Sequence, residues 1–298
     1  MIHVARDQSV FSLSAEAAPV VRIRPGDSLV LDTADCFSDQ VQSAEDAPGA
    51  VDWEHINPAT GPVFVEGAES GDVLSVLVEH IEVAHRGVMA VSGDFGVLRD
   101  RFQGMSFEMI PIEGRFAQVA GASVPVLPMI GVIGVAPAGS PVPCGSPGSH
   151  GGNMDTRLIG EGATLYLPVF APGALLAAGD LHAAMGDGEI CGTGVEVAGS
   201  IKLRVDVRRD VELANPVVET SEVVATIASA ETLDEAADRA TRDMADLLTQ
   251  RLGLSAADAT MLMSAAGQLQ VSQVVDPLKT ARYAMSKEIL AHFGRDLI

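Results

Sequence analysis

The stretch Gly61-Pro-Val-Phe-Val-Glu-Gly-Ala-Glu-Ser-Gly-Asp-Val-Leu-Ser-Val-Leu-Val-Glu79 holds two apolar runs that are separated by a turn of glycine and charged residues. Residues 20–32 and 163–183 repeat this strand–turn–strand pattern, and residues 195–207 add a run with alternating apolar positions. Short strands divided by Gly, Pro and Asp turns are typical of a sandwich or a barrel. We therefore predict β-structure for the first two thirds of the chain.

The dipeptide Gly-Asp recurs in three of these segments, as Gly26-Asp27, Gly71-Asp72 and Gly179-Asp180. Gly-Asp suits a hairpin, because glycine accepts a positive φ and aspartate bonds to nearby backbone groups. We interpret the recurrence as repeated turn chemistry, and an internal duplication is the weaker alternative.

The last third has a pattern that predicts helices. Thr232-Leu-Asp-Glu235 resembles a capping box, and the apolar residues from Leu233 to Leu248 recur at helical spacing. Ser255 can cap a second helix that runs to Met263. Asp276-Pro277 is a good cap and first-turn pair for a third helix, which would end near His292.

These patterns together predict a mainly β fold with added α (α+β). We expect a β-sandwich with the functional site over residues 1–210. Residues 211–298 should form a strand–helix region that packs on the sandwich, so that the two parts make one integrated unit.

The composition limits the possible functions. The chain has 298 residues, 47% of them apolar, which indicates a globular protein with a large core. Its formal net charge of −21 repels phosphate backbones and so disfavours nucleic acid as a partner. Three cysteines do not make a disulfide framework. No secretory signal is visible and no apolar stretch reaches the ~20 residues of a bilayer span, so we expect a cytoplasmic protein without a membrane partner.

Two clusters carry the strongest chemical signal: His150-Gly-Gly-Asn-Met-Asp155 and Gly179-Asp-Leu-His182-Ala-Ala-Met-Gly-Asp187-Gly-Glu189. Imidazole and carboxylate groups hold divalent metals with a position left open for water. We predict His150, Asp155 and His182 as metal ligands. The plainer alternatives are a solvated loop around His150 and a hydrogen-bonded core histidine at His182.

Asp187 and Glu189 stand at alternating positions, so on an extended segment they would share one face. When two carboxylates lie close together, their repulsion raises the pKa of one of them. A raised pKa suits a general acid or base beside a metal. We predict Glu189 as the general base and Asp187 as its partner; a solvated turn is the alternative. Asp35 begins an irregular acidic loop, where it either joins the metal or makes an Asx-turn.

The stretch His55-Ile-Asn-Pro-Ala-Thr-Gly-Pro62-Val-Phe-Val-Glu66-Gly-Ala-Glu-Ser-Gly-Asp72, the two clusters and the tail Val271-Ser-Gln-Val-Val-Asp-Pro277 resemble the signature of the acetamidase/formamidase family. The resemblance runs over most of the chain, in the same order. It implies amidohydrolases of short aliphatic amides, a jelly-roll-like β-sandwich with added helices, homodimers or higher homo-oligomers, and a bound divalent metal. The chain departs from the family at Met185, where glutamine is common, and it is shorter than some members.

These considerations favour a metal-dependent amidohydrolase. Two histidines with carboxylates suit zinc, and the carboxylate-rich flanks could hold calcium as a separate structural site. The backbone N–H groups of Gly151, Gly152 and Asn153 could stabilise the oxyanion. His55 could line the pocket or only hold its own loop. Glu66 is costly within a strand unless it is paired, metal-bound or solvated.

Other chemistries compete with this hypothesis. A cysteine amidase built on Cys191 would need a lysine, and lysine is scarce. No Gly-x-Ser-x-Gly elbow, P-loop or dinucleotide fingerprint is present in the sequence. Two alternatives remain open: a jelly-roll iron(II) oxygenase with two histidines and one carboxylate, and a non-catalytic β-sandwich binding protein in which the metal is a staple.

Overall fold

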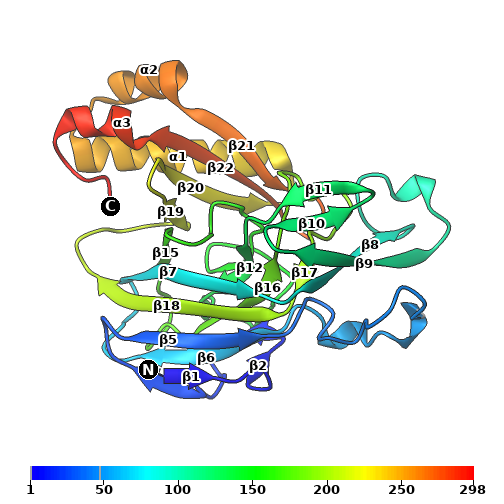
Figure 1. The fold of residues 1–298 in the computed structure, drawn as a ribbon. Coiled ribbons are helices and arrows are strands. Elements are labelled where there is room, and N and C mark those ends of the chain that lie inside the picture. Colours follow the sequence, from blue (N-terminus) through cyan, green and yellow to red (C-terminus); the bar gives the residue numbers. More distant parts are fainter. Residues whose placement is uncertain (1, 47) are drawn as a thin grey trace.

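The computed structural model describes residues 2–46 and 48–298, and its strands form two large sheets that face one another (Figure 1). In this part of the chain the first sheet has nine strands, in the order β1 (Ile2–Val4), β5 (Ser28–Thr33), β18 (Gly199–Arg208), β7 (Val73–Val83), β15 (Thr164–Pro168), β19 (Val217–Glu219), β20 (Val223–Ala230), β22 (Lys279–Ser286) and β21 (Gln268–Gln273). Most neighbours in it are antiparallel, and β1 is parallel to β5.

The second sheet carries most of the chemistry described below. Its main order is β11 (Ala122–Pro125), β10 (Phe116–Val119), β9 (Met105–Glu113), β8 (Arg86–Ser92), β17 (Glu196–Val197), β16 (Leu176–His182), β12 (Met129–Gly134) and β14 (Gly151–Asn153). β6 (Ala59–Val65) also pairs with β16, and it carries β2 (Ser9–Val10) and β4 (Val21–Ile23). β3 (Ser12–Leu13) and β13 (Val142–Pro143) form a separate pair.

The core lies between the two sheets. Leu31 on β5, Val76 on β7, Ile133 on β12 and Leu181 on β16 belong to one buried apolar cluster, although β5 and β7 are in the first sheet and β12 and β16 in the second. Alternating apolar positions turn one face of each sheet inward, and burial of that face is the main favourable term of a sandwich. The mainly β fold predicted from the sequence is confirmed.

The three strand–turn–strand segments are strands as predicted, but they are not hairpins. β4, β6 and β16 lie in the second sheet, while the strands joined to them, β5, β7 and β15, lie in the first. Each connection therefore arches from one sheet to the other. Apolar alternation identifies a strand and its buried face but not its neighbour, so the sequence could not separate an arch from a hairpin.

Two of the Gly-Asp pairs do share one turn chemistry. The Asp27 carboxylate accepts from the backbone N–H of Arg24 at 2.8 Å, and the Asp72 carboxylate accepts from that of Glu69 at 3.0 Å. The preceding glycines have φ of +89° and +98°. Gly179-Asp180 differs, because it lies inside β16. The prediction of a turn there was wrong.

The first two predicted helices are confirmed. α1 (Leu233–Leu252) begins after Thr232, whose side chain accepts from the Glu235 N–H, and α2 (Ala256–Ala266) begins after Ser255. The apolar stripe of α1, including Met244 and Leu248, packs on β20 and β22. The helix therefore covers the outer face of one end of the first sheet, as Figure 1 shows.

The third predicted helix is wrong. Asp276 and Pro277 lie in the connection between β21 and β22, and β22 is followed by the short α3 (Lys287–Leu290) and a 3₁₀-helix (Ala291–Phe293). β22 pairs on both sides, with β20 and β21, and α1 covers it, so tertiary pairing overrides the local cap signal. β19 pairs with β15, so strands on both sides of residue 210 share one sheet, and the domain division at that residue stays a prediction.

None of the helices in the described ranges combines the length and apolarity that a bilayer span requires.

We expect Leu248→Ala to lower the free energy of unfolding by about 2–5 kcal/mol, because this fully buried side chain fills the space between α1 and the sheet. Urea denaturation measures the change. Met261→Ala is the matched control on α2, since Met261 is 62% exposed, and it should change the stability by less than about 0.5 kcal/mol. Equal losses for both variants would contradict the packing described here.

Candidate active site

One imidazole at the end of β16 is surrounded by carboxylates. The Nε2 atom of His182 lies 3.2 Å from Glu196 Oε1, 3.7 Å from Asp180 Oδ2 and 3.8 Å from Asp155 Oδ1. All four side chains are buried. Because an unpaired buried charge is costly, such a cluster requires protons or a bound cation to balance it.

Strand pairing places these groups. His182 stands opposite Glu196, because β16 pairs with β17, and opposite Met129, because it also pairs with β12. Asp155 follows β14 on the other side of β12 and has a φ of +42°. The space between the strands admits only glycine at position 131: a Cβ there would lie 2.6 Å from both an Asp155 and an Asp180 carboxylate oxygen.

The cluster offers two groups of ligand atoms. In one, single atoms of Asp155, His182 and Glu189 lie within 4.8 Å of one another; in the other, the same holds for Cys36, Asp180 and Glu196. The Nδ1 atom of His182 lies 3.3 Å from the sulfur of Met185, which is a weak acceptor. The other ring nitrogen, Nε2, points at the carboxylates.

Burial and like charges control the protonation of the cluster. Burial raises the pKa of Asp155 to about 6 and that of Glu196 to about 8. Burial, and then the charge of Asp155, also raise the pKa of Glu189 well above its usual range. Burial lowers the pKa of His182, but the negative charge of Glu196 and hydrogen bonding by Asp180 and Glu196 outweigh it and raise that pKa. A divalent cation would relieve the same repulsion.

Several polar atoms of the cluster are enclosed and have no hydrogen-bond partner. They are both carboxylate oxygens of Asp155, Asp180 Oδ1, Glu196 Oε2, Asn153 Oδ1 and Asp276 Oδ2. Buried polar atoms are nearly always paired, so these atoms need a partner such as an ion or water. Carboxylate oxygens and one imidazole nitrogen are the donor set of a divalent metal site, and the residues therefore fit a metal.

A cavity of about 280 Å³ opens onto this cluster. Asn153, Asp180, Glu189, Glu196 and Asp276 form its polar part, and Phe37, Trp53, Ile56 and Phe95 are among its apolar walls. A second cavity of about 530 Å³, lined mainly by apolar side chains, shares Glu189 and Thr193 with the first. The smaller cavity therefore combines apolar walls with one polar side, which suits a small ligand whose polar atoms lie close to the carboxylates.

The structure brings three of the predicted site residues together, namely Asp155, His182 and Glu189. Asp187 lies elsewhere: its carboxylate accepts from Arg282 at 2.6 Å and pairs with Arg157 at 3.1 Å. Glu189 has a φ of +47° and Gly188 one of +99°, so the segment is not extended as the prediction assumed. Asp187 and Glu189 both line the second cavity, but only Glu189 belongs to a group of convergent ligand atoms.

Two predicted ligands lie outside both groups. His150 is buried but belongs to neither group found among the described residues, and burial lowers its pKa to about 4, which keeps it neutral. The Asp35 carboxylate accepts from the N–H groups of Phe37 and Asp39 at 3.0 and 2.8 Å, the Asx-turn alternative. Burial raises the pKa of Asp35 to about 6.

The predicted oxyanion donors Gly151, Gly152 and Asn153 form β14, which pairs with β12. The N–H of Gly151 already donates to the Gly148 carbonyl, whereas the side chain of Asn153 faces the cavity.

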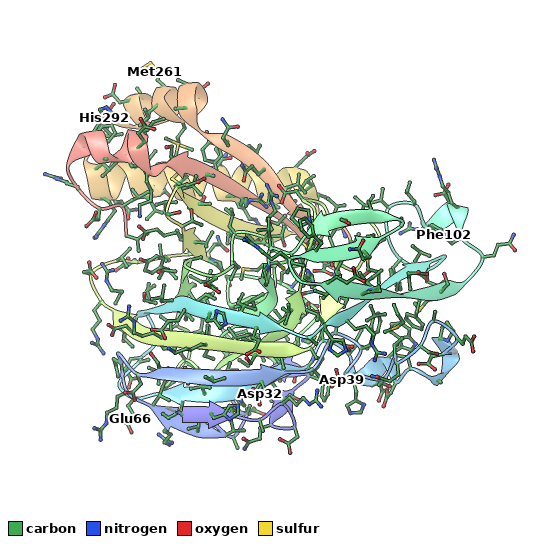
Figure 2. The ribbon with its side chains drawn as sticks, in the orientation of Figure 1. Asp32, Asp39, Glu66, Phe102, Met261 and His292 are labelled. Atoms are coloured by element: carbon green, nitrogen blue, oxygen red, sulfur yellow. The ribbon has the colours of Figure 1, made fainter. Side chains whose placement is uncertain are left out.

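The remaining two predicted pocket residues are exposed. His55 bonds to Asp52 at 2.7 Å and is absent from the cavity lining, although its neighbours Ile56 and Asn57 belong to it. Glu66 pairs with Arg24 and lies at the edge of the molecule in Figure 2, and it is absent from the cavity lining.

Four residues of the cluster were missed in the sequence, namely Cys36, Asp180, Glu196 and Asp276. Asp180 was taken for a turn residue and Asp276 for a helix cap, and neither assignment indicated a place at the cavity. Glu196 stands in a run of apolar residues, where a carboxylate is costly unless it is paired, and that was an available signal. Cys36 had no local signal, because only the fold brings it near Asp180.

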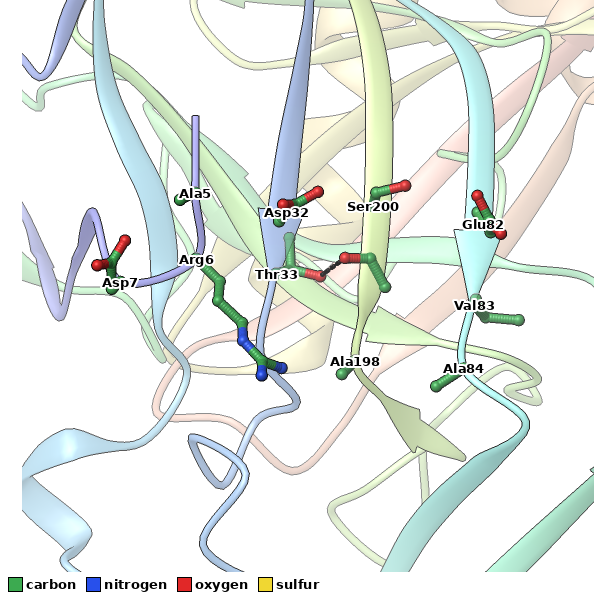
Figure 3. Close-up of a pocket in the computed structure, with 11 residues that line it drawn as sticks. Ala5, Arg6, Asp7, Asp32, Thr33, Glu82, Val83, Ala84, Ala198 and Ser200 are labelled. Atoms are coloured by element: carbon green, nitrogen blue, oxygen red, sulfur yellow. Dashed lines mark hydrogen bonds between the residues drawn. The ribbon is translucent and has the colours of Figure 1, made fainter. Parts of the chain in front are cut away.

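A separate, more open hollow of about 750 Å³ crosses β5, β18 and β7 (Figure 3). Asp7, Asp32 and Glu82 line it together with Arg6, and its lining does not include His182 or the carboxylates around it. It is therefore distinct from the candidate site.

Comparisons with known proteins show which family and which solved structures the chain resembles. The model of the acetamidase/formamidase family matches residues 13–142 and 142–290. A structure described as a predicted acetamidase/formamidase of the thermophile Thermoanaerobacter tengcongensis is 50% identical, with 98% of each chain covered and a TM-score of 0.96. An acetamidase of Bacillus halodurans is 45% identical, with 98% of this chain and 100% of that one covered and a TM-score of 0.96.

Curated relatives are more distant and longer. A formamidase of Methylophilus methylotrophus is 24% identical over 277 residues, which cover 70% of this chain and 67% of that one. The chain spans 61% to 67% of the length of the first two curated relatives that it matches. The family model nevertheless covers nearly all of the sequence, and the chain belongs to the acetamidase/formamidase family.

Proposed function

We propose that this protein hydrolyses short aliphatic amides, such as formamide and acetamide, to ammonia and a carboxylate at a bound divalent cation. The observation that carries the proposal is the set of unpaired, buried carboxylate oxygens around His182, at the wall of a cavity small enough for such substrates. Membership in a family of hydrolases of linear amides supports the reaction type.

Zinc is the proposed metal, and Asp155 and His182 are its proposed ligands, since both belong to one group of convergent ligand atoms. When bound, the cation supplies electrophilic catalysis: it polarises the amide carbonyl and makes water acidic. The second group contains the Cys36 thiol, a soft ligand that suits zinc better than calcium. Neither group offers the roughly six to eight oxygen atoms that calcium prefers, so the separate calcium site has no support from them.

Glu189 is the proposed general base. It lines the cavity and it is buried, and burial together with the charge of Asp155 raises its pKa well above the usual range of a carboxyl group. A raised pKa makes the carboxylate a stronger proton acceptor, which suits a general base. It would take a proton from the attacking water and return it to the departing nitrogen. Phe37 and Phe95 in the cavity wall exclude further water, which strengthens the electrostatic interactions inside.

Asn153 replaces the backbone N–H groups as the proposed donor to the substrate oxygen. Its side chain lines the cavity and its Oδ1 has no partner in the protein, so the amide can turn either its oxygen or its NH₂ group towards a ligand. Because the NH₂ group donates, it can bond to an oxygen on which negative charge develops.

Two earlier expectations continue as proposals: assembly into a homodimer or higher homo-oligomer, and a cytoplasmic location. The iron(II) oxygenase and the metal-stapled binding protein are the competing functions. Ammonia release from formamide separates the hydrolase from both, and oxygen consumption identifies the oxygenase.

We expect removal of the metal with a strong chelator to abolish ammonia release from acetamide and formamide. Addition of zinc should restore it, because the cation polarises the carbonyl. Metal content by mass spectrometry and ammonia release are measured on the same samples. Full activity in protein without detectable metal would overturn metal dependence.

Glu189→Gln should lower kcat by about 100- to 10,000-fold, because the amide cannot accept the proton of the attacking water. Zinc should stay bound through Asp155 and His182. Loss of zinc together with activity would make Glu189 a ligand, and unchanged kcat would remove it from the reaction.

Gly131→Ala should weaken zinc binding about 10- to 100-fold, because the added methyl group would displace the carboxylates of Asp155 and Asp180. Gly49→Ala is the matched control, since a Cβ at Gly49 meets nothing within 4 Å. Zinc affinity is measured by competition with a chromogenic chelator. Equal affinities in the two variants would contradict the assigned position of the site.

A further inference from the structure

Asp187 connects two cationic side chains that come from distant segments. Arg282 Nη2 on β22 donates to Asp187 Oδ2 at 2.6 Å, and Arg157 Nε lies 3.1 Å from Asp187 Oδ1. The Arg282 side chain is fully buried, whereas Arg157 is half exposed. A fully buried guanidinium is rare and requires acceptors for its N–H groups.

The other N–H groups of Arg282 bind β21. Its Nε donates to the Gln270 side chain at 2.8 Å, and its Nη1 donates to the Val271 carbonyl at 3.0 Å and to Ser272 Oγ at 3.1 Å. Ser272 Oγ also accepts from the Thr156 hydroxyl at 2.9 Å. Because Thr156 and Arg157 are adjacent in the chain, these bonds close a ring through Ser272, Arg282 and Asp187.

Each segment of this ring carries one carboxylate of the candidate site. Asp155 directly precedes Thr156, Glu189 follows Asp187 by two residues, and Asp276 lies in the connection between β21 and β22. These three carboxylates repel one another, and each contributes to a cavity or ligand group described above. A scaffold that holds the three segments together therefore opposes that repulsion.

The backbone supports the same arrangement. The Gly188 N–H donates to the Ser272 carbonyl at 2.8 Å, and the Gly188 carbonyl accepts from Val274 at 3.2 Å. Glu189, the next residue, has a left-handed φ of +47°, which is costly for a residue with a Cβ. Such a conformation persists only where its surroundings fix it, and the ring provides that fixation on one side.

We propose that Arg157, Asp187 and Arg282 form a charged clamp that positions Glu189 and Asp155 for the reaction. The clamp rests on the proposed function, and its members are positioning residues, because they act through the carboxylates and not on the substrate. This assignment replaces the predicted role of Asp187 as an acid–base partner of Glu189.

The test compares Asp187→Asn and Arg157→Gln with the wild-type protein. Both variants should lower kcat for acetamide, Asp187→Asn by about 10- to 100-fold, as loss of an outer-shell partner does. KM should change by no more than about threefold, because the substrate still contacts the same cavity walls. The double variant should be no slower than Asp187→Asn alone, since both changes open the same clamp.

Asp210, which follows β18 in the first sheet, offers a control for Asp187. Asp210 also joins two arginines: it accepts from Arg208 at 2.8 Å and lies 3.4 Å from Arg251. Asp210→Asn also removes a carboxylate that joins two arginines, although these arginines are partly exposed, and it touches no site carboxylate. The kcat of this variant should equal that of the wild type. Arg157→Gln guards against misfolding, because its side chain is half exposed.

Crystal structures and zinc affinity separate the clamp from the reaction. In Asp187→Asn, the Glu189 carboxylate should move relative to Asp155, and zinc should bind about 10- to 100-fold more weakly. If the wild-type protein releases no ammonia, the proposed function fails, and the position of Glu189 and the zinc affinity still decide the clamp. The clamp would be overturned if both variants fold and keep the wild-type position of Glu189, zinc affinity and kcat. Additive losses of kcat in the double variant would also overturn it.

Discussion

Mutual repulsion among buried carboxylates is the constraint on which the rest of this structure depends. Asp155, Asp180 and Glu196 converge on the only imidazole of the cluster as the structure describes it, with Glu189 in reach, and several of their oxygens have no partner in the protein. Such a cluster costs stability, and the surrounding fold must compensate for that cost. Three features of the fold hold the carboxylates in place. Their strands, β12, β16 and β17, are paired within one sheet. Gly131 leaves room where a methyl group would collide, and Arg157 and Arg282 pair with Asp187 next to the cluster.

The architecture explains why distant segments meet at this place. The connections from β4, β6 and β15 arch between the two sheets, so neighbouring strands come from different parts of the chain. β21 and β22 extend the first sheet, and the connection between them brings Asp276 to the cavity in the second. The helices stabilise this end from outside: α1 packs on β20 and β22 through its apolar stripe, and none of its residues lines the small cavity.

Local patterns in the sequence predicted what is local in the structure. Alternation located the strands, and Thr232 and Ser255 located two helix starts, because each signal lies within a few residues of its effect. Other features depend on contacts between distant parts of the chain, which no local pattern contains. They are the arches between the two sheets, the strand after Pro277, and the approach of Cys36 and Glu196 to the cluster. The motifs of Asp155 and His182 are compact, and the fold brings both residues into one group of ligand atoms. His150, from the same motif as Asp155, is buried outside the two groups found among the described residues.

Two of the residues that complete the site lie late in the sequence. The buried Arg282 and the cavity residue Asp276 come from the last strands of the first sheet, long after the strands that carry Asp155 and His182 have been synthesised. Non-local sheets form slowly, and their late partners close them. Until β21 and β22 pair, the cavity lacks the wall that carries Asp276, and the Asp187 carboxylate lacks the buried guanidinium of Arg282.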